Sequence, residues 1–223
     1  MTNGVFVDLG CYDGITYSNT WYMERVLNWS GICVEPNPAV YDRIASQAGR
    51  RTGVRRAVSD RKGTAPLVSA FMRSSLNASA VDYAFLQTQG VAAGTVEVEL
   101  TTPGALLAEH LPSTVHAPRT LDYVNIDVEQ LELPILRAWP WRRYCVTLIN
   151  VENTPPAGTP SSLPQLRALL EPRGYEHARR IGGDEVFRRR EPCGAAAASA
   201  GRGPAREARG GGGGRRRARR AAA

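Results

Sequence analysis

The sequence predicts an α/β fold in which a doubly wound, mostly parallel sheet is closed by an antiparallel strand pair. The chain opens with a short apolar run, Val5–Val7, followed by a glycine-rich turn and an apolar pattern at helical spacing. Strand-like and helix-like segments then alternate to about residue 190, and each of the first five strands ends at or near an acid. A buried strand, a tight turn and a helix form the opening unit of such a sheet, whose ligands bind beyond the carboxyl ends of the strands.

The first part of the chain supplies three predicted strands and two helices. The continuous apolar run at residues 5–7 is typical of a strand buried on both faces, and the spacing from residue 21 to residue 27 predicts a helix. Residues 31–35 form the second predicted strand. Asn37 then suits a helix N-cap and Pro38 the first helical position, so a second helix should run to Gly49. Residues 54–58 form the third predicted strand.

The remaining elements follow with one poorly patterned interruption. Residues 65–68 suggest an extra strand, the polar stretch 74–94 is interpreted as an excursion or lid, and residues 96–100 alternate like a half-exposed strand. Further helices are predicted at 103–111, 131–139 and 163–170, and further strands at 123–127 and 144–151. The antiparallel pair is predicted at 175–181 and 185–189, turned at two glycines.

Residues 1–190 form one predicted domain, and residues 191–223 a disordered tail rich in Ala, Gly and Arg. The net charge of the chain is +7, but residues 188–223 hold 11 Arg against 2 acidic residues, so the excess belongs to the tail. Arg-rich tails can bind nucleic acid, but no aromatic residue is interleaved here to stack on bases, so we expect no nucleic-acid partner. Arginine outnumbers lysine 27 to 1, which indicates base-composition bias in the coding sequence.

The four cysteines, Cys11, Cys33, Cys145 and Cys193, form no CxxC pair and no zinc spacing. Because Cys33 and Cys145 lie in apolar runs, we expect reduced, buried thiols there. The sequence contains no secretory signal and no run of about 18 apolar residues, so no membrane span is expected and a reducing, cytoplasmic location is the default expectation.

The acids at the strand ends are Asp8, Glu35, Asp60, Asp127 and Glu152. In a parallel sheet they should line one edge, and an acidic edge attracts S-adenosylmethionine, which carries a net positive charge. A dinucleotide would instead need N–H donors, and the G-x-x-x-G turn lacks the dinucleotide fingerprint. We expect the acid after strand two to accept both ribose hydroxyls and the acid after strand three to accept from the adenine amino group. The helix start near residues 17–20 should receive the methionine carboxylate.

Five runs of the sequence resemble the FkbM-type methyltransferases, a family with the Rossmann-like class I methyltransferase fold. The runs are VDLGCYDGITYSNT (7–20), GICVEPNP (31–38), AVSD (57–60), DYVNIDVEQLELPILRAW (122–139) and GYEHARRIGGDEVF (174–187). The resemblance extends over residues 5 to about 190. It implies S-adenosylmethionine as the cofactor and O-methylation of a hydroxyl on a small molecule, lipid or sugar as the reaction.

The resemblance also implies roles for individual residues. The expected cofactor contacts are Asp8, Gly10, Gly14, Ser18, Asn19, Glu35, Ser59 and Asp60. Asp127 and Glu129 would face the methyl-transfer site, and Glu152 joins them as a candidate catalytic base. These three carry no recognisable metal-ligand spacing, so no metal is expected. The histidines, His110, His116 and His177, fall outside the strand-end motifs and are expected at the surface or in loops.

Two departures from the family pattern leave alternatives open. Gln130 stands where the family usually has glycine, and the chain begins almost on strand one. The first departure predicts a reshaped loop beside the methyl site, and together they keep open a degenerate, non-catalytic cofactor-binding module. A nucleic-acid-associated methyltransferase using the Arg-rich tail is a further alternative.

Overall fold

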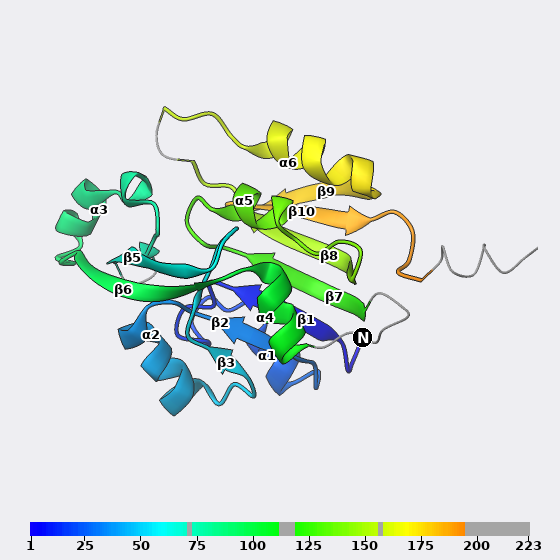
Figure 1. The fold of residues 1–223 in the computed structure, drawn as a ribbon, viewed down its shortest axis with the longest axis horizontal. Coiled ribbons are helices and arrows are strands. Elements are labelled where there is room, and N and C mark those ends of the chain that lie inside the picture. Colours follow the sequence, from blue (N-terminus) through cyan, green and yellow to red (C-terminus); the bar gives the residue numbers. More distant parts are fainter. Residues whose placement is uncertain (71–72, 112–118, 156–157, 195–223) are drawn as a thin grey trace, which may run out of the picture.

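The computed structural model describes residues 1–70, 73–111, 119–155 and 158–194. A seven-stranded sheet with the order β3-β2-β1-β7-β8-β10-β9 forms the centre of the molecule (Figure 1). Its strands are β1 (Val5–Leu9), β2 (Ser30–Val34), β3 (Gly53–Val54), β7 (Arg119–Ile126), β8 (Tyr144–Glu152), β9 (Tyr175–Ile181) and β10 (Asp184–Arg189). Pairing from β3 to β8 is parallel, and β10 is antiparallel to both β8 and β9. The predicted α/β fold, doubly wound with a closing antiparallel pair, is confirmed.

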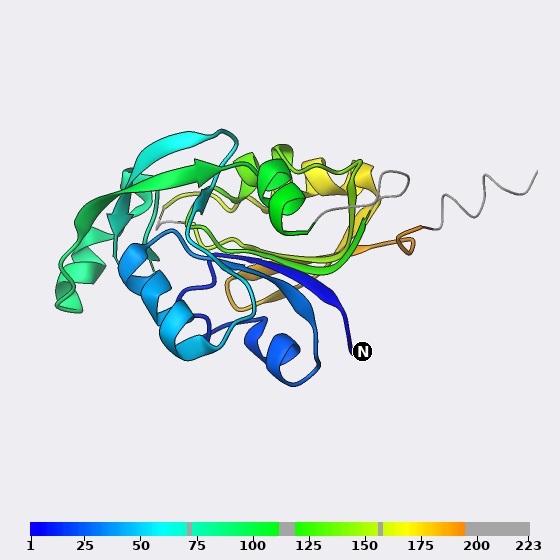
Figure 2. The same ribbon diagram turned by 60° about the horizontal axis from the view of Figure 1, so that its bottom comes forward.

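Helices cover both faces of this sheet. Figure 2 shows α1 (Trp21–Arg25), α2 (Pro38–Arg43) and the π-helix η1 (Ile44–Ala48) below it, and α4 (Pro103–His110), α5 (Glu132–Arg137) and α6 (Leu163–Leu170) above it. As predicted, Asn37 caps α2 by accepting from the Ala39 N–H at 3.2 Å, and Gly49 ends η1 in the left-handed conformation. A single-turn 3₁₀ helix (Glu171–Arg173) follows α6.

A second, three-stranded sheet corrects the prediction of one strand at residues 54–58. Only β3 joins the large sheet, whereas β4 (Ala57–Val58) pairs with β6 (Gly94–Thr101), which also pairs with β5 (Gly63–Ser69). Charged arginines interrupt the apolar run between β3 and β4, and Arg56 forms ion pairs with Glu99 on β6 and Glu109 on α4. The small sheet and α3 (Tyr83–Thr88) lie at the end of the molecule toward which β1 and β2 point (Figure 1).

The polar stretch 74–94 begins with an ordered turn over the strand ends. Val68 and Ser75 form an isolated antiparallel bridge, and Asn77 caps a 3₁₀ turn at Ala78–Ala80 by accepting from the Ser79 N–H. Asp82 then caps α3. The stretch was interpreted as an excursion from the sheet, and the structure shows it as a short helical segment between β5 and β6.

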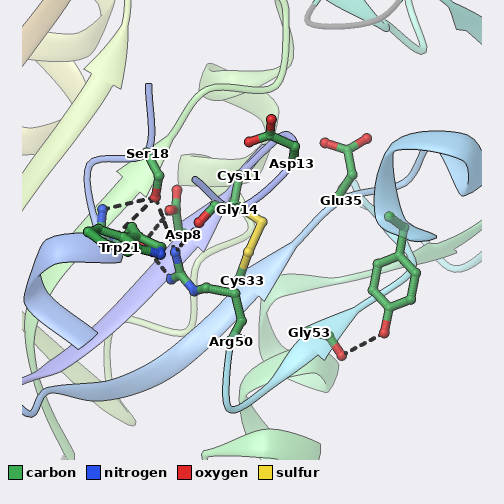
Figure 3. The surroundings of a disulfide bond; sticks show 12 residues. Asp8, Cys11, Asp13, Gly14, Ser18, Trp21, Cys33, Glu35, Arg50 and Gly53 are labelled. Carbon is green, nitrogen blue, oxygen red and sulfur yellow. Dashed lines mark hydrogen bonds between the residues drawn. A yellow bond between two sulfur atoms is a disulfide. The ribbon is translucent and has the colours of Figure 1, made fainter. Parts of the chain in front are cut away.

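Two disulfides contradict the expectation of four reduced thiols. Cys11 is bonded to Cys33 and Cys145 to Cys193. The first pair forms because β1 and β2 are neighbours and the N–H groups of Gly10 and Cys11 both donate to the Val34 carbonyl, which brings the turn after β1 against β2 (Figure 3). Sequence spacing cannot reveal such a pair. Disulfides are typical of oxidising compartments, so the cysteines do not support the expected reducing location.

Cys193 lies inside the stretch that was predicted to be a disordered tail, and its disulfide fixes it to the start of β8. Residues 195–223, which make up the rest of that predicted tail, lie outside the described part of the chain. Within the described ranges, no helix combines the length and the apolar character that crossing a membrane requires.

Candidate functional site

A cavity of about 240 Å³ opens at the carboxyl ends of β1, β2, β7 and β8, where ligands bind in parallel sheets. Most of the predicted site residues line it, namely Asp8, Gly10, Ser18, Asn19, Glu35, Asp127, Glu129 and Glu152. Three others are absent from its lining, namely Gly14, Ser59 and Asp60. Four of the five strand-end acids therefore share one cavity, as predicted from the parallel topology.

Asp60 lies apart from the other acids because its strand, β4, belongs to the small sheet. Its side chain is about half exposed, and its nearest charged partner is Arg61 at 3.9 Å. The neighbouring Ser59 is buried, with its N–H bonded to the Thr101 carbonyl and its hydroxyl to Asp60. The structure thus separates Ser59 and Asp60, predicted to be the adenine region, from the cavity.

The turn after β1 depends on a glycine at position 10. Gly10 has a φ of +83°, and a Cβ atom built there would lie 1.7 Å from the Asp127 carbonyl oxygen. Any other residue would have to push β1 and β7 apart at the floor of the cavity. Gly14, also left-handed with a φ of +78°, lies at the back of the turn against Ala48 and Arg50.

Asp8, at the floor of the cavity, is buried and fully hydrogen-bonded. Its carboxylate accepts from the Thr20 hydroxyl at 2.5 Å and from the Asn125 amide at 3.0 Å. Burial raises the pKa of Asp8, while the hydrogen bonds from Thr20 and Asn125 and the charge of Arg50 act in the opposite direction. The group is therefore held in an environment where a nearby positive charge would favour its ionised form.

The hydrogen bonds of Asp8 continue across the sheet through two buried asparagines that sequence analysis missed. The Asn125 oxygen accepts from the Asn150 amide at 2.8 Å and from the Asn19 amide at 3.2 Å, and Asn150 also donates to Asp184 at 2.6 Å. The sequence carries one indication of these two residues, because an asparagine interrupts each of two otherwise apolar strands, at YVNID and LINVE. This row of amides links the cavity floor to β10.

Glu35 follows β2 and lies across the turn from Asp8 (Figure 3). Its side chain accepts from the Asn37 N–H at 2.8 Å and from the Tyr12 backbone. Burial, supported by the like charges of Asp127 and Asp8, raises the pKa of Glu35 to about 8. Glu35 is thus a fixed carboxyl group whose remaining acceptor capacity faces a cavity that it lines.

Asp127, Glu129 and Glu152 form a cluster on the other side of the cavity, where one oxygen of each lies within 4.8 Å of the others. Burial and the nearby Glu152 raise the pKa of Asp127 to about 9, and burial raises the pKa of both Glu129 and Glu152 to about 7. Asp127 and Glu152 share a hydrogen bond. The cluster can hold and exchange protons near neutral pH, and its spacing is also close enough for one divalent cation.

The loop that carries Glu129 is held by contacts from two sides. The Ser75 hydroxyl, from the stretch after β5, donates to the Glu129 carbonyl at 2.7 Å, and Glu132 accepts from the N–H groups of Val128 and Gln130. Glu129 and Gln130 have φ values of +57° and +83°. The backbone at Gln130 therefore adopts the left-handed conformation that favours glycine, the residue usual at this position in the family that the sequence resembles.

Three arginines near the cavity were also missed, because the many arginines of the chain were attributed to base composition. Arg56 and Arg73 line the cavity, and Arg73 lies over the Phe85 ring with its guanidinium carbon 4.7 Å from the ring centroid. Arg50 lies behind the turn and is fully buried. Nothing in the local sequence distinguishes these three from the other arginines.

The histidines that the structure describes lie away from the cavity. His110 lies 3.5 Å from Glu109, and His177 contacts Glu185 at 2.7 Å and Arg167 at 3.0 Å. His116 lies outside the described residues. Among the described residues, the lining of the cavity therefore offers carboxylates and no histidine as candidate bases.

Three solved structures that align with most of this chain are described as methyltransferases. A TehB-like SAM-dependent methyltransferase from Corynebacterium glutamicum shares 10% identity, with a TM-score of 0.41 over 85% of this chain and 82% of its own. A methyltransferase FkbM from Methylobacillus flagellatus shares 12%, with a TM-score of 0.44 over 84% of this chain and 44% of its own. A precorrin-6y C5,15-methyltransferase from Geobacter metallireducens shares 13%, with a TM-score of 0.39 over 84% and 79%. No curated protein matches the chain.

The family comparison covers most of the described domain. A family model described as the methyltransferase FkbM domain matches residues 8–177, from the acid at the floor of the cavity to β9. The matched range includes the carboxyl end of every strand that borders the cavity. The chain therefore belongs to the FkbM family of methyltransferases, whose methyl donor is S-adenosylmethionine.

Proposed function

We propose that this domain transfers a methyl group from S-adenosylmethionine to a hydroxyl oxygen of a small molecule, lipid or sugar. The observation that carries the proposal is the gathering of Asp8, Glu35, Asp127, Glu129 and Glu152 around one cavity. Asp8 and Glu35 are buried and the other three are half-buried, and carboxyl groups gathered this closely resist ionisation unless a positive charge is near. The methyl donor, a net cation, supplies that charge when it binds.

Glu35 and the turn after β1 suit the donor's nucleoside and amino-acid ends. Two backbone N–H groups fix the Glu35 carboxylate, which leaves acceptor capacity for both hydroxyls of a ribose. Asp8, Ser18 and Asn19 line the adjacent wall, where polar side chains can bind the ammonium and carboxylate groups of the donor. The residues present therefore fit S-adenosylmethionine.

Asp127, Glu129 and Glu152 suit the methyl-transfer step. The donor supplies an activated methyl group, so the protein mainly has to align the acceptor oxygen and remove its proton. Alignment can contribute on the order of 7–11 kcal/mol, and a positioned base about 10²–10⁴-fold in rate. We assign the base to the Asp127–Glu129–Glu152 cluster, whose raised pKa values place its proton exchange near neutral pH.

Two substitutions separate donor binding from methyl transfer. Glu35→Gln removes the ionisable acceptor of the ribose hydroxyls and should weaken binding of S-adenosylhomocysteine by about 10- to 100-fold. Asp127→Asn resembles the neutral carboxyl group and should leave that affinity within about threefold, while lowering the rate of transfer by about 10²–10⁴. Calorimetry measures binding, and transfer of radiolabelled methyl to a panel of hydroxylated metabolites measures turnover.

Asp60→Asn is the matched control, because Asp60 is a strand-end acid outside the cavity. It should change neither affinity nor rate. Tight binding of S-adenosylhomocysteine by the Glu35→Gln variant would contradict the assignment of the ribose acid. Binding by the wild-type protein without transfer to any acceptor would instead favour the non-catalytic cofactor-binding module.

A further inference from the structure

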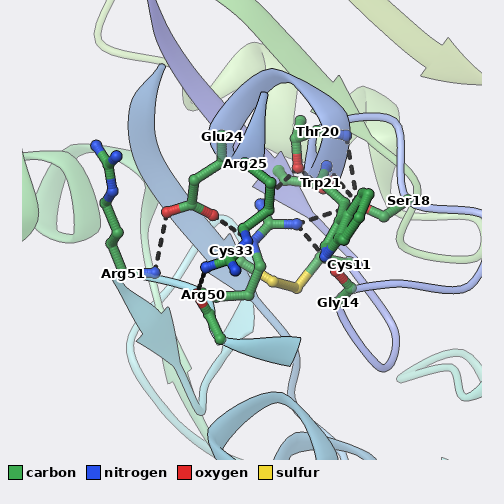
Figure 4. Close-up of polar contacts among 12 residues, drawn as sticks. Cys11, Gly14, Ser18, Thr20, Trp21, Glu24, Arg25, Cys33, Arg50 and Arg51 are labelled. Carbon is green, nitrogen blue, oxygen red and sulfur yellow. Dashed lines mark hydrogen bonds and ion pairs between the residues drawn. A yellow bond between two sulfur atoms is a disulfide. The ribbon is translucent and has the colours of Figure 1, made fainter. Parts of the chain in front are cut away.

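The guanidinium of Arg50, the first residue after the glycine that ends η1, is buried beneath the turn that follows β1. Its Nε atom forms an ion pair with Glu24 at 2.6 Å, and both side chains are almost fully excluded from solvent. The Nη1 atom donates to the Gly14 carbonyl and the Ser18 hydroxyl, each at 3.1 Å, and Nη2 donates to the Thr20 hydroxyl at 2.7 Å (Figure 4). One side chain thus binds three points of the turn.

Arg50 does not line the cavity, so its effect there must pass through other residues. Ser18, which accepts from Arg50, also accepts from the N–H groups of Thr20 and Trp21, and it lines the cavity. Thr20 accepts from Arg50 and donates to Asp8 at 2.5 Å. The contacts therefore run from Arg50 to the wall of the cavity through Ser18 and to its floor through Thr20 and Asp8.

Glu24 anchors Arg50 from behind. The second Glu24 oxygen accepts from the Arg51 N–H at 2.9 Å, so the carboxylate is bound on both sides. A buried arginine held by one carboxylate keeps its planar set of donors in a fixed direction. Both terminal nitrogens of the guanidinium donate to the turn from Gly14 to Thr20.

We propose that Arg50 is a positioning residue of the cofactor site, which fixes the Gly14–Thr20 turn and, through the hydroxyl of Thr20, orients the Asp8 carboxylate at the floor of the cavity. The inference rests on the proposed function, because it takes the cavity to be the donor site. Arg50 touches neither donor nor acceptor in this assignment. Its role is to set the shape and charge of the residues that do.

The charge effect is testable through pH. Asp8 is faced by Arg50 and Thr20 from one side, by Asn125 and Tyr123 of β7 from another, and by the acids Glu35 and Asp127 across the cavity. Burial raises the pKa of Asp8, and Thr20 and Arg50 lower it. Removing either contact should raise the pKa of Asp8 further. Asp8 would then become ionised, and attract the ammonium group of the ligand, only at a higher pH.

The experiment measures the affinity of S-adenosylhomocysteine by calorimetry from pH 6 to pH 9. Arg50→Lys keeps the charge but not the planar donors, and should weaken binding by about tenfold or more. Thr20→Val removes the link to Asp8 and should shift the rise of affinity toward higher pH. If Arg50→Lys fails to fold, the double variant Glu24→Gln with Arg50→Gln replaces it. This variant removes both buried charges together, so it leaves no buried carboxylate without a partner.

Arg51→Gln is the matched control, since Arg51 is the adjacent arginine and its side chain contacts Asn28 and the Trp29 carbonyl instead of the turn. It should bind like the wild-type protein. Affinity unchanged in Arg50→Lys, or a pH profile unchanged in Thr20→Val, would overturn the positioning role, while binding by the wild-type protein would still support the cavity as the donor site. Absence of binding by the wild-type protein would overturn both.

Discussion

Residue 130 is a glutamine whose backbone has the left-handed conformation that favours glycine. Gln130 has a φ of +83°, and its side chain donates to the Thr154 carbonyl at 3.2 Å. A non-glycine residue in the left-handed region costs roughly 1–2 kcal/mol. The preceding Glu129, at the methyl-transfer side of the cavity, is left-handed too. Strain of this kind accumulates where a loop must present a side chain to a site.

Replacing Gln130 should reveal that strain. Gln130→Gly relieves the left-handed backbone, whereas Gln130→Ala keeps it, and both lose the bond to Thr154. We expect the glycine variant to be more stable than the alanine variant by about 1 kcal/mol in the free energy of unfolding, measured by urea denaturation. An alanine variant as stable as the glycine variant would show that the loop carries no such strain. Because Gln130 does not line the cavity, donor affinity should stay unchanged in both.

At the scale of elements, the two disulfides fasten different ends of the parallel strands. Cys11–Cys33 joins the turn after β1 to β2, and Cys11 lines the cavity. Cys145–Cys193 joins the start of β8 to the chain after β10, at the edge opposite the carboxyl ends. The two bridges should therefore contribute alike to stability but differently to binding.

Removing each bridge by paired alanine substitutions tests this difference. From the separations of 22 and 48 residues, loss of Cys11–Cys33 should lower the free energy of unfolding by about 3 kcal/mol and loss of Cys145–Cys193 by about 4 kcal/mol. Only the first should weaken S-adenosylhomocysteine binding, because only the first holds the turn at the cavity. Equal affinities in the two variants, measured by calorimetry, would contradict this assignment.

At the scale of the whole molecule, the acidic cavity makes stability depend on pH. Burial raises the pKa of Asp127 to about 9 and of Glu35 to about 8, and it raises those of Glu129, Glu132 and Glu152 to about 7. In the unfolded chain such groups titrate near pH 4. Between these limits the folded protein binds more protons, so its stability falls as pH rises.

We expect the melting temperature of the ligand-free protein to fall steadily from about pH 5 to about pH 9. The carboxylates with lowered pKa values, Asp13 and Glu109, lose their contribution only below about pH 4 and do not act in this window. Asp127→Asn removes one of the groups and should flatten the slope, as should saturation with S-adenosylmethionine. A melting temperature that is constant or rises over this range would contradict the raised pKa values of these carboxyl groups.

How far the sequence predicts the molecule depends on whether a feature is local. The strand-end acids Asp8, Glu35, Asp127 and Glu152 could be placed together, because parallel strands bring their carboxyl ends to one edge. Asp60 could not be placed correctly, because β4 leaves the large sheet to pair with β6, some forty residues later. The pairing of β4 with β6 joins segments that are far apart in the sequence, so no local sequence pattern indicates it.

The cysteine pairs and Arg50 were missed for the same physical reason. Cys33 lies in an apolar run that also suits a buried thiol, and only the register of β1 beside β2 shows its partner. Arg50 is one of many arginines, and only folding encloses it beneath the turn. The parts of the site that depend on contacts which the regular order of parallel strands does not dictate were therefore beyond sequence analysis.

The bridge between Cys145 and Cys193 also fixes the position of the last described residues of the chain. Cys145 lies at the amino end of β8 and Glu152 at its carboxyl end, and seven residues of extended strand span about 23 Å. An affinity handle or a sensor-chip linker attached directly after Gly194 therefore starts at the end of the sheet opposite the cavity. Immobilisation through that end should therefore leave ligand access unobstructed.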